Sequence, residues 1–317
     1  MSILSTILHT LMKPDFYYAV LRSATPVLFA TLGAIISSAA HCSNIALEGM
    51  MLMGAFVGVV VSAFTQSAFL GLLAAMGAGL LMSLILAFFA INLKSNIIIS
   101  GIALNTLASG GTIFMLYLIT GEKGASTSLH SLKIPDIDIP FLDHIPVLGT
   151  ILSGHNLLTY TALICVILIW VMFKYTRLGL HIIATGENEG AARSVGIDTV
   201  GIKYIALGLS GILSAMGGAF LSMGYVGLFS SGMTAGRGYT ALATQAIAGS
   251  NAVIGLLVSL LFGFCASMSN YLQSTDIPLQ FVKMVPYLTI VIVYTWFCAS
   301  TRRKSQGKKK GRLPDEL

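Results

Sequence analysis

The feature that most constrains this chain is its succession of long apolar segments, divided from one another by short polar ones. A helix needs roughly 20 apolar residues to cross the hydrocarbon core of a bilayer, and several segments of this chain are long enough. Charged residues make up 9% of the 317 residues, whereas about 25% is usual in a soluble domain. The sequence therefore excludes a soluble globule and predicts an all-α, polytopic integral membrane protein.

We expect one transmembrane domain over residues 1–317, with its membrane core at 24–300 and about nine transmembrane helices. On this interpretation residues 1–22 form an amphipathic lead-in. Residues 229–250 are less apolar than the other segments, so they are either a seventh span or a half-helix that lines a cavity. The expected spans are residues 25–40, 45–64, 68–91, 97–119, 157–173, 204–228, 229–250, 253–271 and 285–297.

The basic residues predict the orientation of these spans. If nine spans are present and the basic tail at 302–317 is inside, the inner segments hold twice as many Lys and Arg residues as the outer ones. The positive-inside rule then places the tail and the polar segment at 176–202 in the cytoplasm, and residues 120–156 outside. An odd number of spans puts the N-terminus outside, whereas a re-entrant hairpin at 25–44 would put it inside. This orientation explains the net charge of +6, so we expect no nucleic-acid binding.

The segment at 176–202 is polar in an otherwise apolar chain, and its charge order is that of a short helix outside the membrane. Thr185 is a possible N-cap, Glu189 comes early, Arg193 comes late and Gly196 follows as a possible stop. The helix dipole favours acids in the first turn and bases in the last, and glycine commonly ends a helix. A solvated connector is the alternative. We assign to this cytoplasmic helix the residues Gly186, Glu187, Glu189, Ala191, Ala192, Arg193 and Gly196.

Part of this segment, TRLGLHIIATGENEGAARSVGI, resembles the cytoplasmic signature of the permease subunits of ATP-binding cassette (ABC) importers. Glu189, Ala191, Ala192 and Gly196 fit its loosely written E-A-A…G motif. More closely, residues 21–297 resemble the family that includes ribose, simple-sugar, nucleoside and branched-chain amino-acid permeases. The resemblance therefore covers most of the chain.

Two further stretches are similar to markers of this family. NIALEGMMLMGAF begins at Asn44 and is similar to the version in the sugar and nucleoside branch, and TAGRGYTALATQAIA begins at Thr234, where the family has a Gly-rich entry to a later helix. Ribose-type members start with an additional span, and they carry an aspartate in the first marker, where this chain has Ala46 with Glu48 two positions later. These departures favour the nucleoside-like branch over ribose.

The resemblance implies a machine with several subunits. Two permease chains, identical or, in the favoured case, different, enclose one path. Cytosolic ABC ATPase subunits press on the cytoplasmic helix of each permease chain, so the residues assigned above to this helix, from Gly186 to Gly196, are expected to couple to the ATPase. An extracytoplasmic substrate-binding protein delivers the substrate. This chain has no nucleotide-binding loop of the G-x-x-x-x-G-K-[ST] type, so we expect ATP hydrolysis by the partner subunits only. We expect the protein in the lipid of the bacterial cytoplasmic membrane, carrying a nucleoside or a simple sugar.

Two other functions stay open. Within the family, a branched-chain amino acid is the runner-up substrate. From a different class, a stand-alone ion-coupled carrier or channel would be expected to have more ionisable residues inside its spans. Here Glu48 is the only acid well inside a predicted span, which argues against that class.

Nothing in the sequence predicts catalysis. No span holds a paired acid, a histidine cluster or an activated nucleophile, so we expect no enzyme, no catalytic residue and no cofactor. His130, His144 and His155 share the outer loop, but their spacing matches no metal motif. We therefore expect no metal site and place these histidines at the surface.

Polar side chains in the spans are candidates for the translocation path, because polar groups in lipid are costly unless they are paired or hydrated. Each has a structural alternative. Glu48 could be an acid at the end of its own helix, and Asn105 could be a hydrogen-bonding group between helices. The candidates are Asn44, Glu48, Asn105, Tyr239 and Gln245.

Overall fold

The computed structural model describes residues 13–138 and 148–273 continuously, together with isolated positions outside these ranges. Seven of the described helices are long and apolar enough to cross a membrane. The all-α, polytopic fold class is therefore confirmed. The seven are α2 (Pro14–Ala39), α3 (Leu47–Thr65), α4 (Ala68–Ala87) with its π-helical continuation η1 (Phe88–Asn92), α5 (Ile97–Thr120), α7 (Leu157–Tyr175), α10 (Thr199–Ala219) with η2 (Phe220–Val226), and α12 (Ala252–Leu272).

Shorter elements connect these helices. Two strands pair antiparallel, with Asp136 opposite Asn156 and Ile137 opposite His155. The short elements are β1 (Asp136–Ile137), α6 (Leu148–Leu152), β2 (His155–Asn156), α8 (Arg177–Glu187), α9 (Glu189–Ser194) and α11 (Arg237–Ala248).

The first span differs from the expectation. α2 begins at Pro14 and runs without a break to Ala39, so residues 14–22 belong to the span and are not a separate lead-in. A re-entrant hairpin at 25–44 is likewise wrong. Proline suits the first turn of a helix because the N–H that it lacks would have no partner there. Tertiary packing explains the early start, since Phe16 is fully buried and its ring meets that of Phe264 edge to face at 5.2 Å.

The region between α10 and α12 holds a half-helix. α11 has 12 residues, which rise about 18 Å, short of the ~30 Å hydrocarbon core. It lines a cavity of about 340 Å³ with Arg237 and Thr240. The half-helix interpretation of residues 229–250 is therefore confirmed, and a continuous seventh span is wrong. The expected ninth span at 285–297 lies outside the described residues except at isolated positions, so the count of nine is not confirmed.

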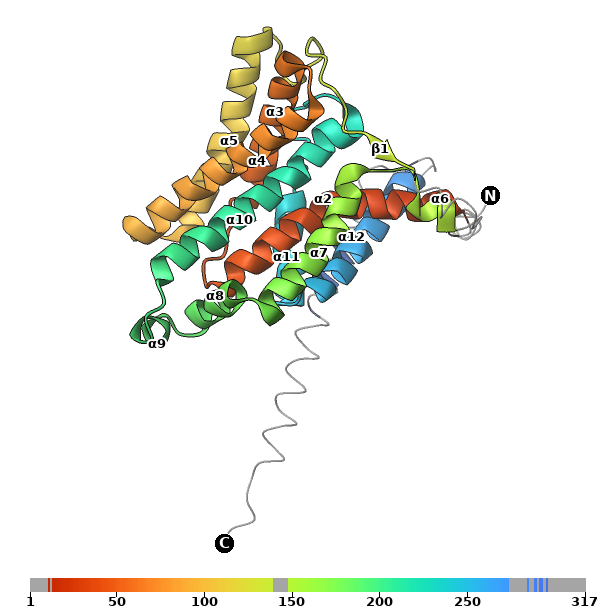
Figure 1. Cartoon of the computed structure of the whole chain (residues 1–317). Coiled ribbons are helices and arrows are strands. Elements are labelled where there is room, and N and C mark those ends of the chain that lie inside the picture. Colours follow the sequence, from red (N-terminus) through yellow and green to blue (C-terminus); the bar gives the residue numbers. More distant parts are fainter. Residues whose placement is uncertain are drawn as a thin grey trace.

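α10 lies at the centre of the bundle, with α2 on one side and α3 and α4 on the other (Figure 1). Glycines allow these helices to approach closely. A Cβ added at Gly218 would lie 1.8 Å from the backbone oxygen of Met51 in α3, and one added at Gly79 in α4 would lie 2.3 Å from that of Gly211. Small residues are typical where helices pack closely in lipid. α10 thus packs directly on three of the other long helices, α2, α3 and α4.

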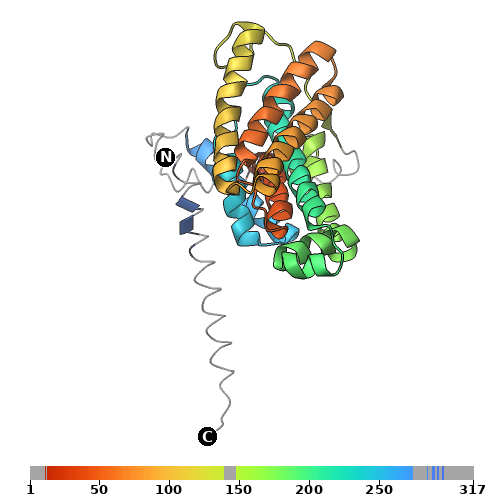
Figure 2. The same ribbon diagram turned by 90° about the vertical axis from the view of Figure 1, so that its left-hand side faces the viewer.

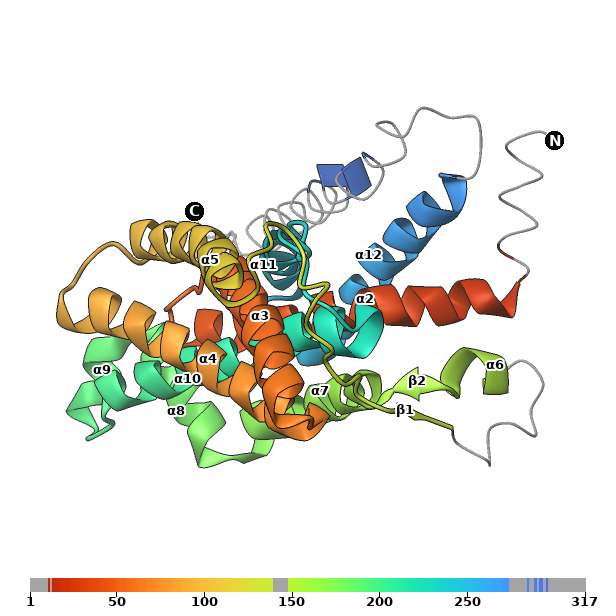
Figure 3. The same ribbon diagram turned by 90° about the horizontal axis from the view of Figure 1, so that it is seen from above.

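The polar segments lie at opposite ends of the bundle. At one end, α8 and α9 gather below the long helices (Figure 2), where Gly186 packs on the backbone of Ala39 at the end of α2. At the other end, near α6, the Tyr18 hydroxyl at the start of α2 donates a hydrogen bond to the Gly154 carbonyl (2.8 Å). Seen from above, α9 and α6 lie on opposite sides (Figure 3). We call these the α9 end and the α6 end.

Candidate coupling and transport sites

The central polar segment folds as two helices, where the sequence predicted one. Asn188 separates α8 from α9, and its side chain accepts a hydrogen bond from the backbone N–H of Ala191 (3.0 Å). Asn188 is therefore the N-cap of α9. The expected N-cap, Thr185, is buried inside α8 instead. Gly196 follows α9 with a φ of 84°, a left-handed conformation that glycine adopts without strain, so its expected role as a stop is met.

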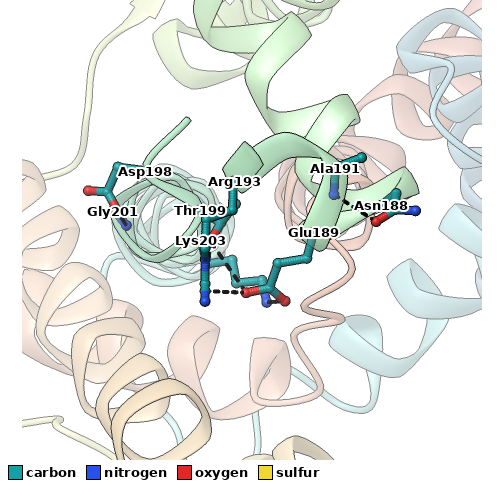
Figure 4. Close-up of polar contacts among 8 residues, drawn as sticks. All are labelled: Asn188, Glu189, Ala191, Arg193, Asp198, Thr199, Gly201 and Lys203. Carbon is teal, nitrogen blue, oxygen red and sulfur yellow. Dashed lines mark hydrogen bonds and ion pairs between the residues drawn. The ribbon is translucent and has the colours of Figure 1, made fainter. Parts of the chain in front are cut away.

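Glu189 joins α9 to the first turn of α10 (Figure 4). Its carboxylate oxygens lie 3.2 Å from Nη2 of Arg193 and 2.5 Å from Nζ of Lys203, and one of them accepts a hydrogen bond from the Thr199 hydroxyl (3.3 Å). The hydrogen bond from the Lys203 ammonium holds the pKa of Glu189 below its usual range. The short helix is thereby tied by charge to the central helix of the bundle.

The outer face of the α9 end carries mainly small side chains. Gly186 and Ala192 pack inward, whereas Glu187, Ala191 and the residues around the end of α9 are exposed. Val195 is 76% exposed. Leu180 in α8 and Val200 at the start of α10 are exposed as well, at 55% and 41%. The α9 end therefore leaves several apolar side chains accessible to another protein.

Glu48 lies at the junction between α3 and the half-helix. Its two carboxylate oxygens accept hydrogen bonds from the backbone N–H groups of Gly236 (2.8 Å) and Gly238 (2.7 Å). The first N–H groups of a helix lack partners within it and attract negative charge. Glu48, in the first turn of α3, is therefore bound to the N-terminus of α11, a helix far along the chain. The expected alternative, an acid at the end of its own helix, did not foresee this partner.

Asn105 links α5 to the same junction. Its side-chain oxygen accepts from the Gly49 N–H (2.7 Å), and its amide nitrogen donates to the Ile45 carbonyl (2.9 Å) and to the Tyr239 hydroxyl (3.2 Å). Asn105 is 9% exposed, whereas Tyr239 is 51% exposed. In this conformation Asn105 holds three segments together, and Tyr239 presents its ring to the outside of the chain.

The other two candidates lie close by. Asn44 is fully buried and donates to the Ser210 hydroxyl (2.9 Å) in α10. Gln245 in α11 donates to the Ser38 hydroxyl (3.0 Å) in α2. The five predicted residues thus gather around the α2–α3 turn and α11, and each makes a hydrogen bond between segments. Whether they line a path stays a prediction.

Comparison with known proteins places the chain in a family. Residues 16–294 match the model of the family described as the permease component of the branched-chain amino acid transport system. The chain belongs to this family. Its members are transport permease subunits and not enzymes, as the sequence predicted. With seven apolar helices among its described residues, the chain is a multi-pass bacterial membrane protein.

Similar permeases carry names from the expected branch. The guanosine ABC transporter permease protein NupQ of Bacillus subtilis is 34% identical, over 88% of this chain and 90% of its own length. The nucleoside ABC transporter permease protein NupC of Lactococcus lactis is 31% identical (86% and 89%). A putative glucose ABC transporter permease protein of Haloferax volcanii, TsgC13, is also 31% identical (88% and 90%). The predicted kinship with ABC permeases of the nucleoside and sugar branch is confirmed.

At its α6 end the permease also has a buried polar cluster around His155, which the sequence did not predict. His130 is exposed as expected, and His144 lies outside the described residues. His155 was expected at the surface, but it is 1% exposed, stacks on the ring of Tyr18 at 4.0 Å, and its Nε2–H donates to the Ile151 carbonyl (2.8 Å). Burial lowers the pKa of His155. Its neighbours in sequence gave no signal, because its stacking partner lies in α2.

Proposed function

We propose that this chain forms one half of the translocation path of an ABC importer and that α9 is the helix on which a cytosolic ATPase acts. The observation that carries this proposal is the Glu189 network, which connects an exposed helix to the buried helix α10. A displacement of α9 would be passed to α10 and, through its close contacts, to α3 and α4. A loop that only connects two spans would not need contacts between its own helix and α10.

The remaining subunits follow from the ABC permease family. The positive-inside rule favours the α9 end as cytoplasmic and the α6 end as extracytoplasmic. A cytosolic ATPase pair would then meet α9, and a substrate-binding protein would meet the α6 end. A second permease chain, preferably a different one, would close the path against the face where Tyr239 is exposed.

The substrate that we propose is a nucleoside, with a simple sugar as the second candidate. The names of NupQ and NupC support a nucleoside, and that of TsgC13 supports a sugar. The exposed ring of Tyr239 offers a flat aromatic face of the kind on which a nucleobase or a sugar ring stacks. The Asn105 amide donates a hydrogen bond to the Tyr239 hydroxyl, and this contact helps to fix the orientation of the ring.

Transport by the reconstituted importer tests both parts of the proposal. With both permease chains, the ATPase subunits and the binding protein in liposomes, we expect ATP-dependent uptake of labelled guanosine. Glu189→Gln should lower uptake by roughly fivefold, at the lower end of the usual range of coupling free energies, and leave insertion intact. Glu122→Gln is the matched control, because that carboxylate also accepts hydrogen bonds but lies in the exposed loop after α5. Uptake by the permease chains without an ATPase would refute the proposal.

A further inference from the structure

A cavity of about 440 Å³ opens at the α9 end of the bundle. Its walls come from the turn after α2, the α4–α5 turn, α9 and the first turns of α10. The side chains that matter for its chemistry are His41, Lys94, Glu189, Arg193 and Lys203. None of the family comparisons assigns a ligand to this place.

The cavity carries an excess of positive charge. Three cationic side chains, Lys94, Arg193 and Lys203, line it together with His41 and one acid. The acid, Glu189, is already engaged by Arg193 and Lys203. Among the described residues no acceptor lies within hydrogen-bonding distance of the Lys94 ammonium, which is exposed. This excess of positive charge favours an anion as the ligand of the cavity.

The turn that carries Lys94 is held in place. Lys94 itself has a left-handed backbone, with a φ of 51°. The next residue, Ser95, donates through its hydroxyl to the Phe89 carbonyl (2.8 Å). The hydroxyl of Tyr204 in α10 donates to the side-chain oxygen of Asn92 (2.7 Å). This hydrogen bond joins the α4–α5 turn to α10, the helix that carries Lys203. Lys94 and Lys203 are therefore held on the walls of the same cavity.

Ile91 and Ile97 also line the cavity, and we call these two residues and their exposed apolar neighbours in sequence the apolar rim. Leu93 is 56% exposed beside Lys94, and Ile98 and Ile99 are 49% and 68% exposed in the first turn of α5. These side chains belong to a membrane-spanning helix and its approach, so they lie where acyl chains begin. An acidic side chain of a docking protein would use the charge of the cavity but not this rim. A ligand with an anionic head and apolar tails uses both.

We propose that this cavity binds the phosphate headgroup of an anionic phospholipid from the leaflet at the α9 end. The phosphate would take the place beside Lys94 and Lys203, and the acyl chains would run along α5. Basic pockets between membrane helices are a known chemistry for anionic headgroups. Because Arg193 and Lys203 also hold Glu189, a bound headgroup would compete for the cations that tie α9 to α10. The inference is independent of the substrate.

Lipid binding to the purified full chain tests the proposal without any transport. The chain in neutral detergent is titrated with phosphatidylglycerol or with phosphatidylcholine, and bound lipid is counted by native mass spectrometry. We expect phosphatidylglycerol to bind more tightly, and Lys94→Gln to weaken it about fivefold, as expected for one basic residue at an anionic surface. Lys94→Arg should keep the binding. Lys174→Gln is the matched control, since that lysine lies at the same end but its ammonium sits over the Trp170 ring (5.0 Å).

Each other outcome overturns the proposal. Equal binding of the two lipids, or unchanged binding after Lys94→Gln, would remove the headgroup site. Displacement of the lipid by millimolar inorganic phosphate would make it a site for free anions. Loss of the bound lipid when the ATPase subunits are added would assign the cavity to an acidic group of the ATPase.

Discussion

Glu48 and Glu189 are two carboxylates that join distant parts of this permease in opposite ways. Glu48 lies within the bundle, and its hydrogen-bond partners among the described residues are two backbone N–H groups, at 2.8 and 2.7 Å. Glu189 lies at the α9 end and binds side-chain cations, with 42% of its side chain exposed. Backbone donors at a helix start are fixed in place, whereas an exposed ion pair contributes at most about 1 kcal/mol. The contacts of Glu48 therefore fix the position of α11 against α3. The contacts of Glu189 can break and form again when a partner binds.

The difference suits a transporter that must move at one end. Exposed side-chain pairs can exchange partners at little cost, because solvent replaces each contact that is lost. At the Glu48 site, Glu48 and Gly236 are half-buried and Gly238 is buried, so solvent replaces less of what a backbone N–H loses there with its acceptor. We therefore expect substitutions at the Glu48 junction to act on stability, and substitutions at Glu189 to act on coupling.

The largest effect on stability should come from Glu48→Ala. It leaves the N–H groups of Gly236 and Gly238 without their acceptors, and hydrogen bonds to charged groups contribute about 1.5 to 3 kcal/mol each. We expect a loss of roughly 3 kcal/mol in the free energy of unfolding, since the two are not additive. Glu48→Gln keeps one acceptor and should lose less. The measurement is thermal unfolding of the purified chain in detergent.

Glu122→Ala provides the control for this comparison. Its carboxylate accepts from the backbone and the hydroxyl of Thr127, but in an exposed loop. We expect a change within about 0.5 kcal/mol, as for most surface substitutions. If Glu48→Ala were no more destabilising than Glu122→Ala, the carboxylate of Glu48 would not anchor α11.

A smaller loss is expected from Asn105→Ala. Three hydrogen bonds disappear, to Gly49, Ile45 and Tyr239. Hydrogen bonds between membrane helices average about 0.6 kcal/mol, so the sum is about 2 kcal/mol. Tyr239→Phe removes only one of them and should cost about a third as much. Equal unfolding temperatures for both variants would show that the contacts of Asn105 to Ile45 and Gly49 contribute nothing.

The α9 region could be predicted because its signals are local. The acid, the base and the glycine of the helix lie close together in sequence, and the order of Glu189, Arg193 and Gly196 is a reliable pattern. The sequence did not predict that Asn188 divides this region into α8 and α9, because Thr185 and Asn188 are both residues that favour an N-cap. Burial of Thr185 against the bundle decides between them, and burial is a tertiary property.

The role of Glu48 could not be predicted in the same way. Hydropathy places the apolar spans, because lipid demands a long apolar run wherever the chain crosses. It does not say which helix ends meet. The partners of Glu48 are backbone groups near residue 237, and no spacing in the sequence points to them. The glycines on either side of Arg237 indicate a loop that leads into a helix. Which side chain accepts the hydrogen bonds of their N–H groups depends on the packing of the helices, and the sequence does not show it.

Acidification should have the smallest effect, and it should act at Glu189. The pKa of this carboxyl in the folded protein is lowered from 4.5, chiefly by the hydrogen bond from Lys203. A lowered pKa means that the stabilising contribution is fully present above 4.5 and is lost as the pH falls through the lower, folded-state value. Because the Glu189 side chain is 42% exposed, solvent weakens the pair, and we expect at most about a fivefold loss of protection at the amides of α9, measured by hydrogen exchange corrected for its intrinsic rate. In Lys203→Met the amides should be less protected at neutral pH and should change less on acidification. The same acid response in Lys203→Met and in the unaltered chain would show that another group controls the attachment of α9.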